Sequence, residues 1–328
     1  MDRYLITGGA GFIGSNYIKY LFENNKDIEI INVDKLTYAG NLENLKGIEN
    51  NENYTFIKED ICNRNSLEDI FKFYKPNFII NFAAESHVDR SIESSQKFIK
   101  TNVLGTQVLL ECSLNSKIEK FIQISTDEVY GSLESGFSTE ESLLRPRNPY
   151  AASKASADLL VQSFYNTYGL PIIITRSSNN YGPHQHNEKL IPKIITNCLD
   201  RRKIPIYGRG TNVRDWIYVL DNCHAINTVL NKGSIGEVYN ISSNIEKRNI
   251  DLVNIIIKKI KEVLQNKGID TEGINKDLIK YVTDRKGHDK RYGINATKLK
   301  ETLNWNITTQ LESGLEKTIN WYIDNNLY

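Results

Sequence analysis

The chain has 328 residues, of which 40% are hydrophobic and 25% charged, and its formal net charge is +1 at pH 7. This composition is typical of a globular protein with a large core, built as one large domain or two intimate ones. The near-neutral charge gives no broad electrostatic reason to expect nucleic acid or an anionic membrane as partner. No apolar run approaches the ~20 residues of a membrane span, and the chain opens on a strand-like segment instead of a signal peptide. We therefore expect a soluble, cytoplasmic protein.

The cysteines and histidines indicate neither a disulfide framework nor a metal site. The four cysteines are scattered, with no CxxC spacing, which fits a reducing compartment. His184 and His186 lie one residue apart, and such a pair in a loop more often binds nothing. We expect no metal.

The first predicted strand, residues 4–7, runs into a glycine-rich turn, after which an amphipathic helix is expected from Ser15. Gly8, Gly11 and Gly14 lie three residues apart. Glycines at this spacing allow a tight turn and bring backbone N–H groups close to a pyrophosphate at the helix N-terminus. The pattern, with a strand before it and a helix after it, predicts a dinucleotide site.

The second predicted strand, residues 29–33, ends at Asp34, which is 34 − 14 = 20 residues beyond Gly14. At this interval an acidic residue accepts hydrogen bonds from the ribose hydroxyls of NAD. The carboxylate would also repel the 2′-phosphate of NADP, so we expect NAD as the cofactor.

Strands and helices alternate through the first half of the chain. This alternation predicts a parallel, doubly wound α/β sheet. After residue 176 the alternation loosens, which favours a smaller substrate-facing domain. The further segments are strands at 54–57, 78–82, 120–124 and 172–176, and helices at 66–74, 98–113 and 251–264.

A polar stretch, residues 125–131, follows the buried strand at 120–124. In an open parallel sheet, ligands bind beyond the carboxyl ends of the strands. The hydroxyl of Thr126 and the carboxylates of Asp127 and Glu128 are therefore placed to touch a substrate. The alternative is that two adjacent acids at a turn are simply solvated.

Tyr150 and Lys154 open the next helix and, four residues apart, share one of its faces. A nearby ammonium would lower the pKa of the Tyr150 phenol towards that of a useful base. Tyr-x-x-x-Lys pairs are common by chance, so the preceding dinucleotide motif is what makes this one specific.

The glycine pattern together with Tyr150-x-x-x-Lys154 resembles the extended short-chain dehydrogenase/reductase family over nearly the whole chain. Within that family, the runs at 34–40, 83–91 and 125–131 resemble the dTDP-glucose 4,6-dehydratases. The resemblance implies a Rossmann-like sheet with a smaller C-terminal substrate-binding domain. We expect an NAD-binding domain at 1–176, to which the chain returns near 215–241, and a nucleotide-sugar-binding domain at 177–328.

The cofactor and substrate residues are expected at the strand ends and in the polar loops of the second half. Taken without the resemblance, the basic and aromatic residues of those loops would equally suit a solvated face. For NAD we expect Gly8, Gly11, Phe12, Ile13, Gly14, Asp34, Lys35, Leu36, Thr37, Asp60, Ile61, Phe82, Ala83, Ala84, Ser86, Thr101, Ser125, Tyr150, Lys154 and Asn180. For the nucleotide diphosphate-sugar, by resemblance dTDP-glucose, we expect Ser86, Thr126, Asp127, Glu128, Asn179, Lys189, Leu190, Pro205, Ile206, Tyr207, Arg214, Asn249, Asp284, Arg285, Lys286, Gly287 and His288.

The resemblance also implies a mechanism. Tyr150, near Lys154, would take a proton from the C4 hydroxyl while NAD takes hydride, and Thr126 would hydrogen-bond that oxygen. Glu128 would then remove the C5 proton and Asp127 would protonate the departing C6 hydroxyl. Return of hydride to C6 would give dTDP-4-keto-6-deoxyglucose and regenerate NAD, so a tightly held cofactor is expected.

Three other functions stay open on the sequence. A nucleotide-sugar 4-epimerase would not need the two carboxylates, and a decarboxylase has less need of an acid at Asp127. A non-catalytic NAD-binding protein would not require Thr126, Tyr150 and Lys154 together. The choice of dTDP rests on resemblance alone, because no residue we can name reads the thymine methyl.

The resemblance further implies a homodimer through the helices at 98–113 and 151–164, and a role in dTDP-rhamnose or another deoxysugar pathway.

Overall fold

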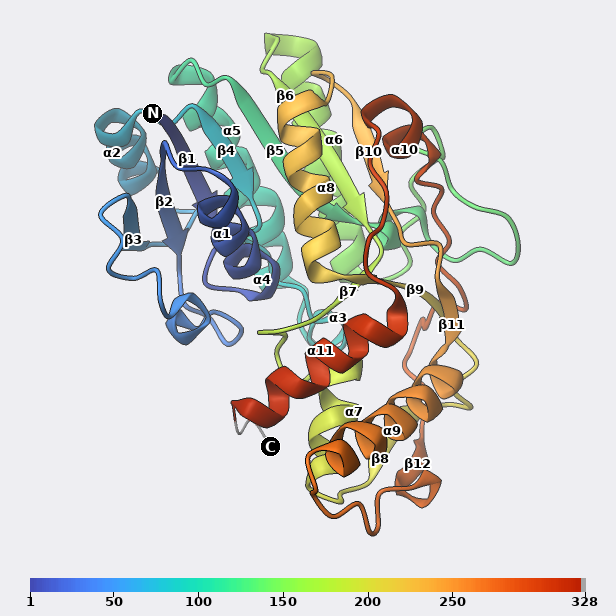
Figure 1. Ribbon diagram of the computed structural model, residues 1–328. Coiled ribbons are helices and arrows are strands. Elements are labelled where there is room, and N and C mark those ends of the chain that lie inside the picture. The colour runs from blue at the N-terminus through green and yellow to red at the C-terminus, as the bar shows by residue number, and fades with distance from the viewer. Residues whose placement is uncertain (326–328) are drawn as a thin grey trace.

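The computed structural model describes residues 1–325. Its largest element is a seven-stranded parallel sheet in the order β10-β6-β5-β4-β1-β2-β3 (Figure 1). The order reverses between β1 and β4, which is the switch point where a doubly wound sheet opens a crevice for ligands. The strands are β1 (Asp2–Thr7), β2 (Ile28–Asp34), β3 (Tyr54–Lys58), β4 (Phe78–Asn81), β5 (Lys120–Thr126), β6 (Ile172–Ser177) and β10 (Val238–Ile241).

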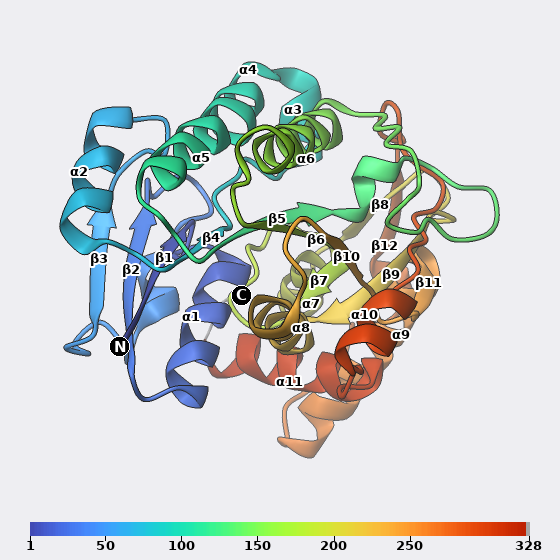
Figure 2. The same cartoon turned by 90° about the horizontal axis from the view of Figure 1, so that it is seen from above.

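Helices cover both faces of this sheet, so its central strands are apolar on both sides (Figure 2). Ile30 and Ile122 face the layer of α1 (Phe12–Asn24) and α8 (Val219–Lys232). Leu5 and Phe121 face the opposite layer of α2 (Arg64–Tyr74), α5 (Thr106–Asn115) and α6 (Pro149–Tyr168). The expected Rossmann-like architecture is confirmed.

The helix predicted at 98–113 has the right position but is not one continuous α-helix. It consists of α4 (Gln96–Phe98), a π-helical stretch (Ile99–Gly105, labelled η2) and α5. Within the wide turns, the buried Asn102 bonds the backbone of Glu85 at 2.8 and 3.0 Å and the hydroxyl of Ser153 at 2.8 Å. Such π-helical turns often lie at functional sites.

A smaller lobe lies beyond the carboxyl edge of the large sheet (Figure 1). It contains the sheets β11-β9-β7 and β12-β8, around an apolar core of its own. The strands are β7 (Asn179–Tyr181), β8 (Ile204–Tyr207), β9 (Val213–Tyr218), β11 (Glu246–Arg248) and β12 (Ile279–Val282). The helices are α7 (Leu190–Leu199), α9 (Asn249–Asn266) and α11 (Leu311–Asp324). Short elements complete the described chain: η1 (Leu42–Leu45), α3 (Val88–Glu93), η3 (Asp127–Tyr130), η4 (Lys276–Leu278) and α10 (Thr297–Leu303).

The chain passes between the lobes more than once. β9 pairs with β7 and β11 of the smaller lobe, so the return to the large lobe starts with α8 at Val219. It ends with β10, which pairs with β6. Leu299 and Trp305 then pack into the core of the large lobe, a second return that the sequence did not suggest. Within residues 1–325, no helix is both long and apolar enough to cross a bilayer.

Candidate active site

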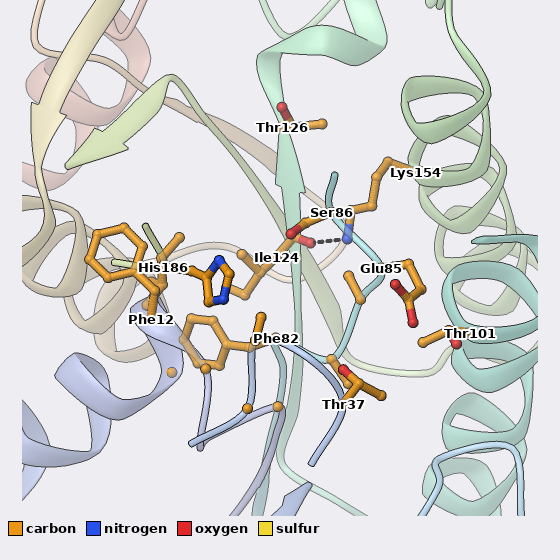
Figure 3. Close-up of a pocket in the computed structure, with 18 of the residues that line it drawn as sticks. Phe12, Thr37, Phe82, Glu85, Ser86, Thr101, Ile124, Thr126, Lys154 and His186 are labelled. Carbon is orange, nitrogen blue, oxygen red and sulfur yellow. Dashed lines mark hydrogen bonds between the residues drawn. The ribbon is translucent and has the colours of Figure 1, made fainter. Parts of the chain in front are cut away.

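A cavity lies at the carboxyl ends of β1, β2, β4 and β5, facing the smaller lobe (Figure 3). It encloses about 1630 Å³, its open mouth included. The cavity runs from the glycine turn at Gly8–Gly14 past the strand ends to Tyr150 and Lys189, so one continuous surface joins the predicted cofactor residues to the predicted substrate residues nearest the sheet. Within the described chain, it is lined by every residue that the sequence predicted for the cofactor except Leu36.

The glycine turn at one end of the cavity leaves no space for side chains. A Cβ at Gly8, whose φ is +69°, would lie 2.6 Å from the backbone nitrogen of Ala83. A Cβ at Gly14 would lie 2.5 Å from the carbonyl oxygen of Gly8. α1 starts at Phe12 with no side-chain cap from Gly11, so its first N–H groups are available to an anion. The turn fits a pyrophosphate.

Asp34 ends β2 beside this turn, and it is buried. Its carboxylate accepts hydrogen bonds from the N–H of Ala10 at 2.9 Å and of Leu36 at 2.8 Å. Burial raises the pKa of Asp34, and the two hydrogen bonds partly offset that effect. Leu36 itself does not line the cavity, and it supports the site through its backbone. Next to it, Lys35 pairs with Asp60 at 2.8 Å.

At the end of β5, two adjacent carboxyl groups lie in different environments. Asp127 is buried, and burial followed by the charge of Glu128 raises its pKa well above the usual range. The hydroxyl of Thr126 lies 3.2 Å from Asp127 Oδ1, and Asp127 Oδ2 has no hydrogen-bond partner among the described residues. Asp127 is therefore suited to carry a proton and to give it to a ligand.

Glu128 instead receives hydrogen bonds that suit a carboxylate. Asn148 Nδ2 donates to its Oε2 at 3.1 Å, and the hydroxyl of Tyr292 lies 3.2 Å from the same oxygen. That hydroxyl also contacts Asp289 at 2.5 Å, while the Arg214 guanidinium lies 4.2 Å from the Tyr292 ring centre. Two neighbouring carboxyl groups in such different environments are the arrangement that acid–base catalysis needs.

The pair formed by Tyr150 and Lys154 differs from the prediction. Burial and the charge of Glu128 raise the pKa of Tyr150, with a hydrogen bond to Thr126 acting in the other direction. Lys154 does not lower it, because the buried ammonium donates to the carbonyl of Ile124 at 2.5 Å. Burial lowers the pKa of Lys154 itself to about 8. The expected phenolate-favouring contact was wrong, although both residues line the cavity.

Of the predicted substrate residues, those nearest the sheet meet at the cavity, and some of the others, among them Tyr207, Asp284, Arg285 and His288, form a second group. Lys189 lines the cavity and donates to the carbonyl of Ser86 at 2.9 Å, and the Oδ1 of Asn179 is buried without a partner among the described residues. The residues outside the cavity are Leu190, Pro205, Ile206, Tyr207, Arg214, Asn249, Asp284, Arg285, Lys286, Gly287 and His288.

The second group centres on an ion pair between the lobes. Arg285 donates to both carboxylate oxygens of Asp89 in α3, at 2.5 and 3.1 Å, and the hydroxyl of Tyr207 reaches Asp89 at 3.1 Å. Burial opposes ionisation of Asp89, but Arg285 outweighs it and the pKa of Asp89 is lowered. Asp284 bonds His288 at 2.6 Å. The side chain of Ile206 is buried in the core of the smaller lobe, so a ligand can meet only its backbone.

Several cavity residues were not predicted from the sequence. Most lie one or two positions from a predicted residue, and that proximity was the available signal. Tyr292 and Asn148, which reach Glu128 without lining the cavity, were not predicted as its partners, because the contacts join segments 164 and 20 residues apart. The unpredicted lining residues are Val33, Ala39, Gly40, Glu59, Glu85, Ile124, Ser177, Ser178, Gln185, His186 and Glu188.

A Rossmann-like sheet with this glycine turn and these strand-end groups defines a nucleotide-sugar-modifying class of short-chain dehydrogenases, and sequence comparison agrees. The chain belongs to the GDP-mannose 4,6 dehydratase family, whose sequence model matches residues 5–318.

Individual relatives are similar over their full length. The chain is 46% identical to a dTDP-glucose 4,6-dehydratase of Escherichia coli, over 98% of this chain and 94% of that protein. It is 48% identical to the low-salt glycan biosynthesis protein Agl12 of Haloferax volcanii, over 97% and 98%. Among solved structures, a dTDP-glucose 4,6-dehydratase of Bacillus anthracis in complex with NAD superposes with a TM-score of 0.90 at 47% identity, covering 100% of this chain and 98% of that one.

Proposed function

We propose that the chain is a dTDP-glucose 4,6-dehydratase, which converts dTDP-glucose to dTDP-4-keto-6-deoxyglucose and water with NAD as its cofactor. The observation that carries the proposal is the pair of adjacent carboxyl groups at the end of β5. Burial raises the pKa of Asp127, Glu128 accepts a hydrogen bond from Asn148, and both line the cavity that contains the glycine turn. Full-length relatives with this activity support the assignment.

NAD fits the residues present. The crowded Gly8 and Gly14 fit a pyrophosphate on α1, and the buried Asp34 suits the ribose hydroxyls and disfavours the phosphate of NADP. The buried oxygen of Asn180, which lacks a partner among the described residues, lines the same cavity. When bound there, the cofactor would accept hydride from C4 of the sugar and return it to C6.

The carboxyl groups perform the elimination. Oxidation at C4 makes the proton on C5 acidic, and Glu128 removes it as general base. Asp127, whose proton is retained by burial, donates it to the hydroxyl leaving C6. An epimerase has no such step, so this pair favours the dehydratase.

Tyr150 and Thr126 serve the C4 oxygen. Both residues line the cavity and their side chains bond each other, so a sugar hydroxyl placed there would contact both. To take the C4 hydroxyl proton as hydride leaves C4, Tyr150 must act as the phenolate, which becomes the neutral phenol, while Thr126 would hydrogen-bond the same oxygen. The ammonium of Lys154 lines the same cavity and donates to the carbonyl of Ile124.

The smaller lobe binds the nucleotide diphosphate. Arg285 and Arg214 are suited to phosphate oxygens, and Lys189 reaches the cavity from the start of α7. The ring of Tyr207, which packs against His288, offers a stacking surface for the base. We accordingly assign NAD binding to the large lobe and nucleotide-sugar binding to the smaller one.

We also propose that the protein is a cytoplasmic homodimer that serves the synthesis of dTDP-rhamnose or another deoxysugar. Ile99, Leu104 and Leu159 are 50%, 44% and 57% exposed on the helical stretches predicted to pair. Exposed apolar side chains on helices are suited to an interface between copies. The four cysteines are free in the described chain, which suits a reducing compartment.

A panel of dTDP-, UDP-, CDP- and GDP-sugars tests the proposal by mass spectrometry of the products. We expect loss of one water from dTDP-glucose without added reductant. A product of unchanged mass would instead identify an epimerase, and carbon dioxide from a sugar-acid nucleotide would identify a decarboxylase. Retained NAD with no turnover of any sugar would point to a non-catalytic protein.

A further inference from the structure

One wall of the cavity is a loop without regular structure. Residues 182–188 make up all but the last residue of the connection from β7 to α7, and Gln185, His186 and Glu188 of this loop line the cavity. His186 lies at the side of the cavity formed by Phe12 and Phe82 (Figure 3). The loop therefore borders the start of α1, where the cofactor's pyrophosphate is proposed to bind.

Helix α1 holds the loop from one side. The buried Asn16 donates from its Nδ2 to the carbonyl of Pro183 at 3.0 Å. One turn further on, the ammonium of Lys19 lies 3.1 Å from Nε2 of His184. Burial, and then the charge of Lys19, lower the pKa of His184 to about 4, so the neutral ring accepts this hydrogen bond at neutral pH.

Helix α11 holds the loop from the other side. The hydroxyl of the buried Tyr322 donates to the carbonyl of Gln185, one residue before His186. The neighbouring Trp321 packs its ring edge against His184, with 4.7 Å between ring centres. Neither Trp321 nor Tyr322 lines the cavity, and this loop is a direct link from them to the cavity wall.

The contacts fix the loop's backbone as well as its side chains. His184 has a φ of +69°, in the left-handed region that residues with a Cβ rarely adopt. A strained backbone persists only where surrounding contacts hold it. The carbonyls on either side of His184 are those bonded by Asn16 and Tyr322.

We infer that α1 and α11 clamp the loop at 182–188, and that this clamp slows the departure of the cofactor. Tyr322 and Trp321 are thus positioning residues for a site they do not touch. The consequence for the cofactor rests on the proposed function, whereas the clamp itself does not. Because the cofactor is regenerated in each cycle, a slow departure would let one molecule serve many turnovers.

Tyr322→Phe tests the clamp with the smallest change, and it spares α1, which contacts the cofactor site directly. The matched control is Tyr239→Phe. Tyr239 is also buried, and its hydroxyl accepts one hydrogen bond, from the N–H of Ser234 at 3.1 Å, in the part of β10 away from the cavity. Two quantities are measured: hydrogen exchange at the amides of 184–188 in protein stripped of NAD, and the rate at which bound NAD leaves.

We expect Tyr322→Phe to speed both amide exchange in the loop and NAD departure by about three- to tenfold, the usual effect of losing one buried hydrogen bond. Tyr239→Phe should leave both within a factor of two. Unchanged loop exchange in Tyr322→Phe would overturn the clamp, as would equal acceleration in both variants, which would mean general destabilisation. Faster amide exchange in the loop, with an unchanged rate of NAD departure, would overturn the clamp's role in retaining NAD. Wild-type protein that takes up no NAD would instead overturn the proposed function, and the exchange data would still decide the clamp.

Discussion

The two lobes build their shares of the site in different ways. The large lobe uses backbone and short side chains: glycines with no room for a Cβ, and strand-end groups such as Thr126 and Asp127. The smaller lobe uses long charged side chains, such as Arg285, which reaches across to Asp89. Strand ends fix reacting groups tightly, whereas long side chains can exchange one partner for another. Substitutions at the reacting groups of the large lobe should therefore slow the chemistry, those at its cofactor residues should weaken NAD binding, and those in the smaller lobe should weaken substrate binding.

The largest expected effect is that of Glu128→Gln. The amide keeps the shape of the side chain and an oxygen for Asn148, but it cannot take the C5 proton. We expect water loss from dTDP-glucose to fall ~10³–10⁴-fold, the upper part of the range for a general base. Entry of solvent deuterium at C5, measured by mass spectrometry, should stop while the Kd for dTDP-glucose changes little.

Glu119→Gln is the control for that substitution, since Glu119 also accepts from an asparagine amide, that of Asn77 at 2.9 Å, on the surface. It should leave deuterium entry unchanged. If Glu128→Gln kept the wild-type rate of deuterium entry, another group would be the base.

A smaller loss is expected for Asp127→Asn. Without its acid, the enzyme must expel the C6 hydroxyl with help from water, and we expect a rate about 10²-fold lower, the lower part of the range for acid catalysis. Since Asp127 acts protonated and its pKa is raised, the wild-type rate of water loss should fall as pH rises through that raised pKa. The fall should vanish from the pH–rate profile of Asp127→Asn. A profile identical to that of the wild type would assign the acid elsewhere.

How far the sequence predicted the site also differs between the lobes. Apolar strand runs, the glycine spacing and the position of Asp34 are local signals, and they located the cofactor cavity. Contacts made across the chain leave no local signal. The bonds from Asn148 and Tyr292 to Glu128 depend on how distant segments pack, as does the Lys154 ammonium turning to the carbonyl of Ile124.

The binding residues of the smaller lobe were predicted less completely for the same reason, because contacts between distant segments leave no local signal. Its basic and aromatic residues were predicted as a set, but the sequence could not say which would line the cavity and which would pair with the opposite lobe. Ile206, predicted beside Tyr207, is in a strand whose alternate side chains face the core. In the smaller lobe, the resemblance to a known family supplied the substrate-binding positions. The packing of the chain decides which of their side chains are free to contact a ligand.

For the smaller lobe, Arg285→Gln should weaken binding and spare chemistry. A hydrogen bond to a charged partner is worth about 1.5–3 kcal/mol, so the Kd for dTDP should rise roughly 10–100-fold. The rate of water loss at saturating substrate should change less than about threefold. Arg248→Gln, which removes the exposed pair with Asp251, is the control and should leave the Kd unchanged. A variant that lost rate but kept its Kd would contradict the division of labour between the lobes.

The smallest effect is expected for Asp34→Asn. This substitution tests whether the strand-end carboxylate or the backbone of the glycine turn selects the cofactor in the large lobe. The carboxylate holds two N–H groups, and an amide has only one acceptor oxygen to replace it. We expect NAD to bind about three- to tenfold more weakly, the effect of one hydrogen bond, with the rate at saturating NAD preserved. NADP should bind relatively better, because the charge that repels its 2′-phosphate is gone. Calorimetric titration of stripped protein with both cofactors measures the ratio, with the exposed Asp27→Asn at the other end of β2 as control. An unchanged ratio would mean that the backbone around the glycine turn, and not the strand-end carboxylate, selects the cofactor.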